Sequence, residues 1–579
     1  CPRAGGAEAQ GGLRPHVDTR NFRCLLVSDF NPSNFASYLE NDGEPPLLDA
    51  LIGDFGQVVP LLTDFSAPPW QHEPDFAVVW TRPEGVIPSF QSLLDFQPVP
   101  ERQLLDEVDA FAGALVQAAQ KLKAVFVPTW TLDTSHRGLG MADLRKGNGA
   151  RALLEMNLRL VANLDASANV FPLDAQRWLV FGGRQASSPK LWYQAKIPFG
   201  NEVFQAAVAD VKAAIRGLRG QARKLIVLDL DDTLWGGIVG EVGWQNLELG
   251  GHDPVGEAFR DFQRTLKSLT RRGIVLGIVS KNTESVALTA IRENPEMVLK
   301  LEDFAGWRIN WHDKAANLVD LVAELNLGLQ SAVFIDNSPI ERGRVRDDMP
   351  EVLVPEWPED PLLYSTALRS LRCFDSPGIS REDLERSQSY VADRGRADLK
   401  HQAGSLDEWL KSLGIKVTVE PLSPANLRRA AQLLNKTNQL NLTTRRMTEQ
   451  ELDSWAKPPG RRIWVFRVVD RFGDAGLTGL ASLEKQGDTA RIVDFLLSCR
   501  VIGRKVEETM VAWLVRQARE LGSAEVRAEY RPTPKNPPCL EFWQRSGFGC
   551  QDPHVFTLRT EAGYPPPECV ELFTRDAHD

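Results

Sequence analysis

The chain of 579 residues is too long for one hydrophobic core, and its length predicts three or four domains. Hydrophobic residues make up 43% of it and charged residues 25%, the composition of an ordinary globular protein. A net charge of −10 argues against general nucleic-acid binding, and no apolar stretch approaches the ~20 residues that a membrane-spanning helix needs. The seven cysteines are scattered without CxxC pairs, which argues against a disulfide framework or a zinc site. With no hydrophobic signal segment at the start of the sequence, we expect a cytoplasmic protein.

Strand and helix patterns alternate between residues 21 and 190, which predicts a three-layer α/β domain. In this pattern the segment PLLDALIGDF, 46–55, is interpreted as a helix between two strands. The first strand runs into VSDF, which faintly resembles the first sequence block of SGNH esterases, where a serine follows the aspartate. Phe30 stands at the place of that serine, so we expect an SGNH-like domain without esterase chemistry, used for docking or structure. Asp29 and His136 are interpreted as turn and surface residues.

The stretch KLIVLDLDDTLWGG begins as a buried strand and ends in closely spaced aspartates. Residues 225–228 predict a parallel strand, and open α/β sheets bind ligands at the carboxyl ends of such strands. Side chains alternate along an extended chain, so Asp229 and Asp231 are expected to point the same way. One of them can attack phosphorus while the other gives a proton to the leaving oxygen, and Mg²⁺ prefers such oxygen ligands. A solvated surface loop with two aspartates is the alternative interpretation.

Two further predicted strands and one predicted helix carry polar residues that suit a phosphoryl group. GIVLGIVSKN predicts a strand that ends in Ser280 and Asn282, whose hydroxyl and amide suit a phosphoryl group. Lys314 lies in WHDKAANLVDLVAELNLG, a segment with helical apolar spacing, and a lysine near a phosphate offsets its charge during transfer. SAVFIDNSPIER predicts a third strand, with Asp336 and Asn337 at its end.

These motifs, taken in order, resemble the haloacid-dehalogenase (HAD) phosphatase superfamily. The resemblance implies that Asp229 is a nucleophile forming an aspartyl-phosphate, that Asp231 is the acid/base, and that Lys314 neutralises charge. It also implies Mg²⁺ bound by Asp229, by the main-chain carbonyl of Asp231 and by a motif-four side chain, Asn337 as in the CTD-phosphatase branch or else Asp336. The short stretch WGGIVGEVGWQNLEL leaves no room for a large cap, so an open site suited to a large or tethered substrate is expected. The residues expected to bind the phosphoryl group are Thr233, Ser280, Lys281 and Asn282.

From residue 415 onward the order of predicted strands and helices resembles the GNAT acyltransferase fold. In acyl-CoA-binding GNAT proteins a turn of the form Arg/Gln-x-x-Gly-x-Gly/Ala holds a pyrophosphate at a helix N-terminus. The segment CRVIGRKVEE keeps Arg500 and Gly503 of that turn but has Lys505 at the place of the small residue. Together with Arg504 this predicts a basic helix start able to bind the phosphate of a phosphopantetheine arm, or a solvated positive helix start.

Cys499 lies immediately before this turn. A helix N-terminus and a neighbouring arginine both favour a thiolate, so Cys499 is a candidate to carry an acyl group, with a packed core cysteine as the alternative. Asn435 and Thr437 are interpreted as lining an acyl or pantetheine channel, or as capping the end of their helix. Lys535 and Asn536 are expected either to contact the carrier arm or to lie in an exposed loop.

From the N-terminal α/β domain onward, the chain resembles the FkbH-like family through DLDDTLWGGIVGE, SKN, FIDNSPIER, LLNKTNQLNLTTRR, DRFGDAG, LLSCRVIGR and PTPKN. The resemblance implies a bifunctional glyceryltransferase/phosphatase of polyketide biosynthesis. Such an enzyme takes D-3-phosphoglyceryl from 1,3-bisphosphoglycerate, removes the phosphate and loads glyceryl onto the phosphopantetheine arm of an acyl carrier protein. The chain departs from the expected motifs at Asp232, where asparagine is expected, at Val279, where cysteine is expected, and at the pair Asn337 and Ser338, where Asp-Asn is expected.

Two other functions remain open from the sequence: a Mg²⁺-dependent phosphatase of a metabolite or phosphoprotein without acyl transfer, and a carrier-protein scaffold with vestigial sites. The predicted fold class is multidomain α/β. Its expected parts are a disordered tail (1–20), an SGNH-like α/β domain (21–190), a HAD-like Rossmannoid domain with a minimal cap (221–375), a charged helical connector (380–414) and a GNAT-like α+β domain (415–579).

Overall fold

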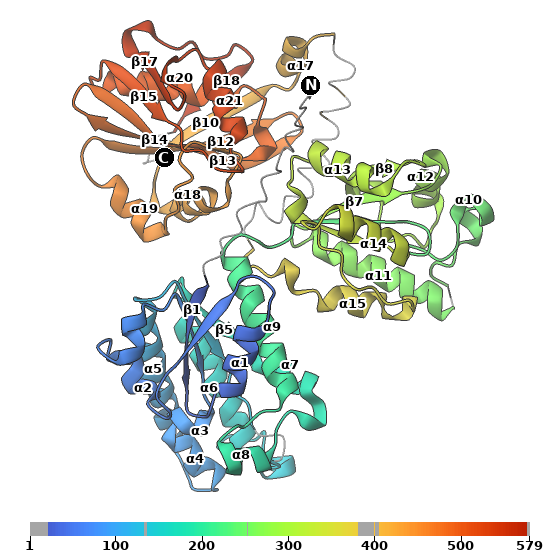
Figure 1. Cartoon of the computed structure of the whole chain (residues 1–579), viewed down its shortest axis with the longest axis vertical. Helices are drawn as coiled ribbons and strands as arrows, with labels where there is room; N and C mark the ends of the chain where they lie inside the picture. The colour runs from blue at the N-terminus through green and yellow to red at the C-terminus, as the bar shows by residue number, and fades with distance from the viewer. Residues whose placement is uncertain are drawn as a thin grey trace, which may run out of the picture. The chain divides into compact units, whose positions relative to one another are not determined.

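The computed structural model describes residues 21–132, 136–251, 253–379, 396, 399 and 404–575. The expected tail and most of the expected connector lie outside these residues. The chain forms two compact units, of which the first ends at Arg219 and the second begins at Gly220. Figure 1 shows three separate sheets, each flanked by its own helices. Within the described ranges, no helix is long and apolar enough to cross a membrane.

The first unit is built on five parallel strands in the order β2-β1-β3-β4-β5. Successive residues of β1, which lies between β2 and β3, enter different cores: Leu25 and Val27 pack on one face of the sheet, while Cys24 and Leu26 pack on the other. This alternation confirms the predicted three layers. The strands are β1 (Phe22–Ser28), β2 (Leu48–Ile52), β3 (Phe76–Trp80), β4 (Ala124–Pro128) and β5 (Val170–Leu173). The helices are α1 (Ser33–Asn41), α2 (Val58–Thr63), α3 (Pro83–Val86), α4 (Pro88–Leu94), α5 (Glu101–Ala119), α6 (Gly149–Leu164), α7 (Ala175–Gly182), α8 (Pro189–Ala195) and α9 (Asn201–Leu218).

Two expectations for this unit differ from the structure. The segment 46–55 is not a helix: it contains β2, which pairs in parallel with β1, and the helix between those two strands is α1. Apolar residues stand at positions 47, 48, 51, 52 and 55, and this spacing of three and four residues also fits a helix. The unit also continues past residue 190, because α9 buries Val203, Phe204 and Val211 in the core shared with β1 and β3.

The second sheet consists of four parallel strands in the order β8-β7-β6-β9. All three predicted motif-bearing strands are present, and β6 lies between the other two, so their carboxyl ends meet at one edge. Between β6 and α11 the described residues form short helices and two isolated bridges, Asp231 to Trp235 and Gly236 to Glu248, which agrees with a minimal cap. The strands are β6 (Leu225–Leu228), β7 (Val275–Ser280), β8 (Phe304–Ile309) and β9 (Ala332–Ile335). The helices are α10 (Val239–Val242), α11 (Pro254–Thr270), α12 (Glu284–Glu293), α13 (Lys314–Glu324), α14 (Pro339–Asp348) and α15 (Tyr364–Ser370).

The third sheet has the order β16-β17-β15-β14-β13-β12-β10-β18 and is mostly antiparallel, with β11 paired to the end of β14. The strands β10 and β12 to β15 and the helices α18 and α20 lie where the sequence predicts strands and helices, whereas β11, α19, α21 and β16 to β18 are additional. The strands are β10 (Ile415–Pro421), β11 (Leu440–Asn441), β12 (Arg461–Asp470), β13 (Gly473–Gln486), β14 (Thr489–Leu497), β15 (Glu525–Glu529), β16 (Gly549–Asp552), β17 (Val555–Arg559) and β18 (Val570–Thr574). The helices are α17 (Leu406–Ser412), α18 (Pro424–Lys436), α19 (Glu449–Ala456), α20 (Val506–Glu520) and α21 (Pro537–Arg545).

Candidate functional site

The strongest candidate site lies at the carboxyl edge of the four-stranded sheet. Asp229 is the first residue after β6, and its amide donates to the carbonyl of Ile335 at the end of β9, 3.0 Å away. Asp336 follows Ile335 directly. The neighbouring strands therefore bring two carboxyl groups from distant parts of the sequence to one point.

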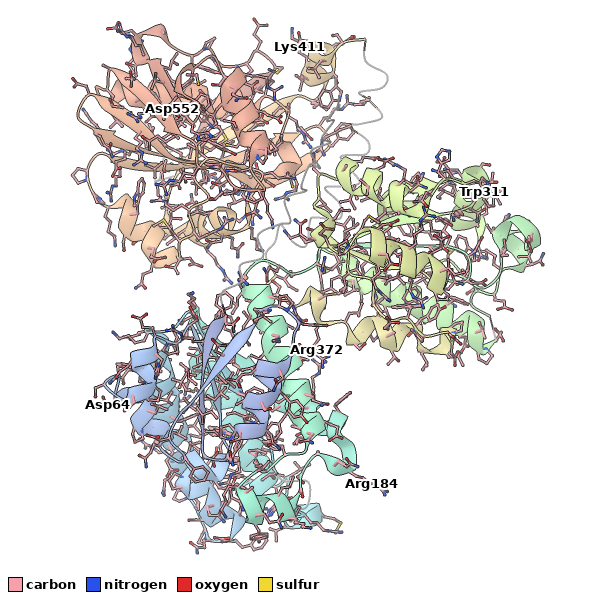
Figure 2. The ribbon with its side chains drawn as sticks, in the orientation of Figure 1. Asp64, Arg184, Trp311, Arg372, Lys411 and Asp552 are labelled. Atoms are coloured by element: carbon pink, nitrogen blue, oxygen red, sulfur yellow. The ribbon has the colours of Figure 1, made fainter. Side chains whose placement is uncertain are left out.

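Lys314 connects these two carboxyl groups. Its Nζ lies 2.8 Å from Oδ2 of Asp229 and 2.6 Å from Oδ2 of Asp336, and all three side chains are buried. Burial by itself disfavours the ammonium, but the two carboxylates outweigh it and raise the pKa of Lys314. Lys314 is the first residue of α13, and an exposed Trp311 lies in the loop just before it (Figure 2).

Asp336 is the most enclosed member of the cluster, with no exposed surface. Burial and the charge of Asp229 raise the pKa of Asp336 to about 6, and Lys314 opposes this shift. Its second oxygen accepts a hydrogen bond from the amide of Ser338, 2.8 Å away. Asp336 is therefore held within the protein, and its expected part as a second-choice metal ligand is not supported by the geometry.

Asp231 receives three N–H groups. Its Oδ1 accepts from Trp235 Nε1 at 2.9 Å and from the amide of Val239 at 3.1 Å, and its Oδ2 accepts from Asn282 Nδ2 at 2.8 Å. Burial raises the pKa of Asp231, the hydrogen bonds from Val239 and Trp235 lower it, and the charge of Asp229 raises it further, so that the net shift is upward. A raised pKa suits a group that must donate a proton.

Thr233 and Arg342 fix the backbone and side chain of the motif-four asparagine. The Thr233 hydroxyl accepts from the amide of Asn337 at 3.1 Å and donates to its Oδ1 at 3.2 Å. The buried Arg342 donates to the carbonyls of Asp336 and Asn337, each 2.8 Å away. Thr233 is fully buried and positions Asn337, which corrects the expectation that it binds the phosphoryl group.

The oxygen donors at this edge fit Mg²⁺. In the described part of the chain, no group of three or more His, Cys, Asp or Glu side chains is arranged to hold a metal, so the side chains of Asp229, Asp231 and Asp336 do not form a carboxylate cage. The set that remains is a carboxylate oxygen of Asp229, the main-chain carbonyl of Asp231 and the side-chain oxygen of Asn337, which is partly exposed. Mg²⁺ is bound by few protein oxygens and keeps several waters, and these three donors match that preference.

The residues after β7 take different positions from one another. Ser280 ends the strand and is buried. Lys281 forms an ion pair with Glu341 at 2.7 Å. Asn282 donates to the carboxylate of Asp231, whereas the sequence predicted that it binds the phosphoryl group. The sequence also gave no sign of Trp235, because an indole after a catalytic motif is indistinguishable from a core residue.

The departure from the expected motif at Asp232 is compatible with the loop. Asp232 has a positive φ of 53°, a conformation that both asparagine and aspartate tolerate. Its Oδ1 accepts from the amide of Gly237 at 2.7 Å, and its carbonyl accepts from the Tyr364 hydroxyl at 3.2 Å. The substitution therefore preserves the motif-one turn.

Cys499 lies just beyond the end of β14, in a one-turn helix, and is partly exposed with a free thiol. The helix α20 begins at Val506, seven residues beyond Cys499. The neighbouring Arg500 donates to the Ser498 hydroxyl at 3.4 Å. The thiol is thus accessible, and its activation by the helix end and by Arg500 stays a prediction.

The expected anion cradle after Cys499 is occupied by the protein itself. The amide of Gly503 donates to the buried carboxylate of Glu507, 2.6 Å away. Arg504 is buried and pairs with Asp470 at 3.1 Å. Burial raises the pKa of Glu507 to about 7, with the Gly503 bond opposing that shift. Gly503 and Arg504 therefore make structural contacts within the protein. This corrects the prediction that they bind the phosphate of a phosphopantetheine arm.

Other predicted carrier-binding residues also have structural roles. The side-chain amide of Asn435 donates to the Met447 carbonyl at 2.8 Å and accepts from its amide at 3.1 Å. Thr437 follows the last residue of α18, in agreement with the capping interpretation. Asn536 has no exposed surface, so neither predicted environment, the carrier arm or an exposed loop, is correct for it.

The first unit offers no nucleophile at the place where SGNH esterases have one. Phe30 is buried against Trp80 and Phe199, with ring centroids 5.6 Å away in both cases. Asp29 is not a surface turn residue: it is buried and pairs with Arg82 at 3.0 Å. His136 is exposed, as predicted.

One solved structure resembles a large part of this chain. The crystal structure of the N-terminal part of the protein BF1531 from Bacteroides fragilis, containing a phosphatase domain complexed with Mg, is 28% identical. The match covers 63% of this chain and 96% of that one, with a TM-score of 0.57. No family model matches the chain, and no curated protein matches it.

Acetyltransferase structures match a shorter part. The ribosomal-protein-S18-alanine N-acetyltransferase from Escherichia coli is 12% identical and covers 25% of this chain and 94% of its own, with a TM-score of 0.20. Spermidine/spermine N-acetyltransferase SpeG from Vibrio cholerae is 14% identical and covers 26% and 95%, again with a TM-score of 0.20. The C-terminal fold is therefore defined here by the strand order of the third sheet.

Proposed function

We propose that this chain is a bifunctional enzyme with a Mg²⁺-dependent phosphatase site at Asp229 and an acyl-bearing thiol at Cys499. In this proposal it takes 3-phosphoglyceryl from 1,3-bisphosphoglycerate, removes the phosphate and transfers glyceryl to an acyl carrier protein. The observation that carries the phosphatase half is the contact of Lys314 with Asp229 and Asp336, beside an Asp231 with a raised pKa. The likeness to a Mg-bound phosphatase domain supports the same assignment.

The geometry supports a two-step phosphoryl transfer. A carboxylate oxygen of Asp229 attacks phosphorus, and Asp231 gives a proton to the leaving oxygen. Lys314 remains at the nucleophile throughout and offsets the negative charge of the transferring group. When bound, Mg²⁺ supplies further charge neutralisation at the phosphoryl oxygens.

The acyl half is supported by the chemistry of the substrate and by the FkbH-like motif order. An acyl phosphate is already activated, so the Cys499 sulfur can form a thioester as the carbonyl-to-phosphate C–O bond breaks and inorganic phosphate leaves. The thiol is partly exposed and unpaired with another cysteine, as this step requires. Its proton passes to the leaving phosphate. The carrier arm's thiol then takes the acyl group by thioester exchange.

A phosphatase without acyl transfer is the second candidate. The specific observation that favours it is the engagement of Gly503 by Glu507 and of Arg504 by Asp470, which removes the expected phosphopantetheine contacts. Formation of an acyl adduct on the enzyme separates the two candidates.

The test is intact-protein mass spectrometry after mixing enzyme, Mg²⁺ and freshly generated 1,3-bisphosphoglycerate. We expect a glyceryl adduct on the wild type, a phosphoglyceryl adduct on Asp229→Asn and no adduct on Cys499→Ala. Cys550→Ala is the matched control, since Cys550 is another free cysteine of the same domain and is more exposed. Phosphate release without any adduct, or an adduct that survives in Cys499→Ala, would refute the acyl-enzyme step.

A further inference from the structure

Both oxygens of the Asp231 carboxyl group accept hydrogen bonds from side chains, one in the loop after β6 and the other in the loop after β7. We propose that Trp235 and Asn282 are positioning residues that orient this group, so that Oδ2 is the atom that exchanges the proton in the phosphatase reaction. The inference rests on the proposed phosphatase function and deepens it, because neither residue was assigned this role by its sequence motif.

The hydrogen-bond count decides which oxygen carries the proton. Each carboxyl oxygen has two lone-pair sites. On Oδ1 both are used, by Trp235 Nε1 at 2.9 Å and by the amide of Val239 at 3.1 Å. Among the described residues, only one donor reaches Oδ2, Asn282 Nδ2 at 2.8 Å. A proton can therefore reside on Oδ2 without the loss of any of the three bonds.

The two holding side chains are themselves fixed. Trp235 has no exposed surface and belongs to the core on one face of the sheet. Asn282 is 4% exposed, and its own side-chain oxygen accepts from the amide of Thr283 at 2.9 Å, which orients its N–H groups toward Asp231. Because one donor follows β6 and the other follows β7, rotation of the Asp231 carboxyl group would break bonds on both sides. Such fixed donors place a reacting group without reorganisation during the reaction.

The reaction steps then balance at named atoms. In the first step, the Asp231 Oδ2–H bond breaks and its proton passes to the bridging oxygen of the ester. The bond from phosphorus to that oxygen breaks, and an Asp229 oxygen bonds to phosphorus. In the second step, a water proton returns to Oδ2 and the water oxygen bonds to phosphorus. The bond from phosphorus to Asp229 breaks, which restores the starting state. After the first step, the three N–H groups stabilise the negative charge left on Asp231.

A purely structural role for these bonds makes a different prediction. If they served only to hold the loop that leads into α10, their loss would slow every substrate by a similar factor. A positioning role affects only the proton transfer, so a substrate whose leaving group needs no proton should be spared.

The test compares Trp235→Phe and Asn282→Ala with the wild type on phosphate monoesters, from alkyl esters to 2,4-dinitrophenyl phosphate, with Mg²⁺ present. We expect each variant to lower kcat/KM at least about tenfold for the alkyl esters and less than about threefold for the dinitrophenyl ester. Asp231→Asn should show the same dependence of the loss on the leaving group. Two variants from different elements keep the test valid if one of them fails to fold. Trp307→Phe is the matched control, because it removes an indole bond of 2.9 Å to the carboxylate of Glu284 elsewhere in the same domain.

Equal losses across the ester series in both folded variants, or a leaving-group dependence as steep in Trp307→Phe, would overturn the positioning role while leaving the phosphatase function intact. A wild type that hydrolyses none of the esters would instead refute the phosphatase function, and the positioning role with it.

Discussion

Lys314 controls the electrostatics of the phosphatase site because one ammonium serves two buried carboxyl groups. With both carboxyl groups ionised the cluster carries a net negative charge in a buried environment, and this explains why the pKa of Asp336 is raised. The same arrangement leaves Asp229, the proposed nucleophile, paired with a cation before any substrate arrives. Two predictions follow from this charge balance, one for catalysis and one for stability.

We expect Lys314→Met to lower kcat about 10²- to 10³-fold, because it removes a fixed positive group at the point where charge is transferred. Lys281→Met is the control. Its ammonium pairs with Glu341 at 2.7 Å, so we expect a loss of less than about tenfold. Steady-state kinetics on a single phosphate ester gives both numbers, and similar losses in the two variants would contradict the assignment of Lys314.

Asp336 gives a pH prediction with a definite sign. Its pKa is about 6 in the folded chain against an ordinary value of 3.8, so between these values the folded state holds a proton that the unfolded state has lost. The contribution of this group to stability therefore falls as the pH rises from about 4 to about 6. In EDTA, the melting temperature of the wild type minus that of Asp336→Asn should decrease over this range. A difference that stays constant or increases would contradict the raised pKa.

At the residue scale, the sequence predicted which residues gather at the edge of the four-stranded sheet better than it predicted their individual contacts. Asp229, Asp231 and Lys314 were recognisable because their residue types follow strand patterns in a fixed order. Arg504 was assigned to an anion because its partner, Asp470, lies 34 positions away and no local pattern connects them. A long-range contact of this kind becomes visible only when the chain is folded.

Among the elements, the short strand β11 has the largest consequence for the C-terminal domain. β14 pairs with β15 only through residues 489–492, and beyond that point β11 pairs with the end of β14. Asn536 attaches the loop after β15 to β11: its Nδ2 donates to the carbonyls of Asn441 and Arg531, both 2.9 Å away. The side of β14 next to Cys499 is thus closed by the chain's own backbone.

We expect Asn536→Ala to destabilise the C-terminal domain by about 3 kcal/mol, since it leaves buried backbone carbonyls and the Tyr530 hydroxyl without this partner. Lys535→Ala, the exposed neighbour, should change stability by less than about 0.5 kcal/mol. Scanning calorimetry provides the comparison. An Asn536→Ala variant that melts with the wild type would show that the loop is held by other contacts.

The elements that the sequence predicted correctly are those with long apolar runs or clear helical spacing, such as β6, β7, β9 and α20. The elements that it missed lack such a signal. β11 has two residues, and β2 is an edge strand with its buried side chain at Leu48 and partly exposed neighbours. Their strand character comes from hydrogen bonds to β14 and β1, which a local pattern does not contain.

At the scale of the whole molecule, the division at Arg219 and Gly220 separates two units with their own sheets and cores. We expect residues 220–579 alone to be soluble and to hydrolyse small phosphate esters within about threefold of the full chain, because each of the residues in the proposed phosphatase reaction lies in this unit. An insoluble or inactive fragment beside an active full chain would show that the first unit is required for folding or catalysis.

The most direct test of the central claim is to trap the phosphorylated enzyme. Asp231→Asn should accumulate it when mixed with Mg²⁺ and 2,4-dinitrophenyl phosphate, because this leaving group needs no proton whereas hydrolysis of the aspartyl-phosphate needs Asp231 as base. After acid quenching, peptide mass spectrometry should find one phosphoryl group on the peptide that contains Asp229, and none there when Asp229→Asn is added to the variant. Phosphate release without this adduct, or an adduct on another residue, would contradict the assignment of Asp229 as the nucleophile.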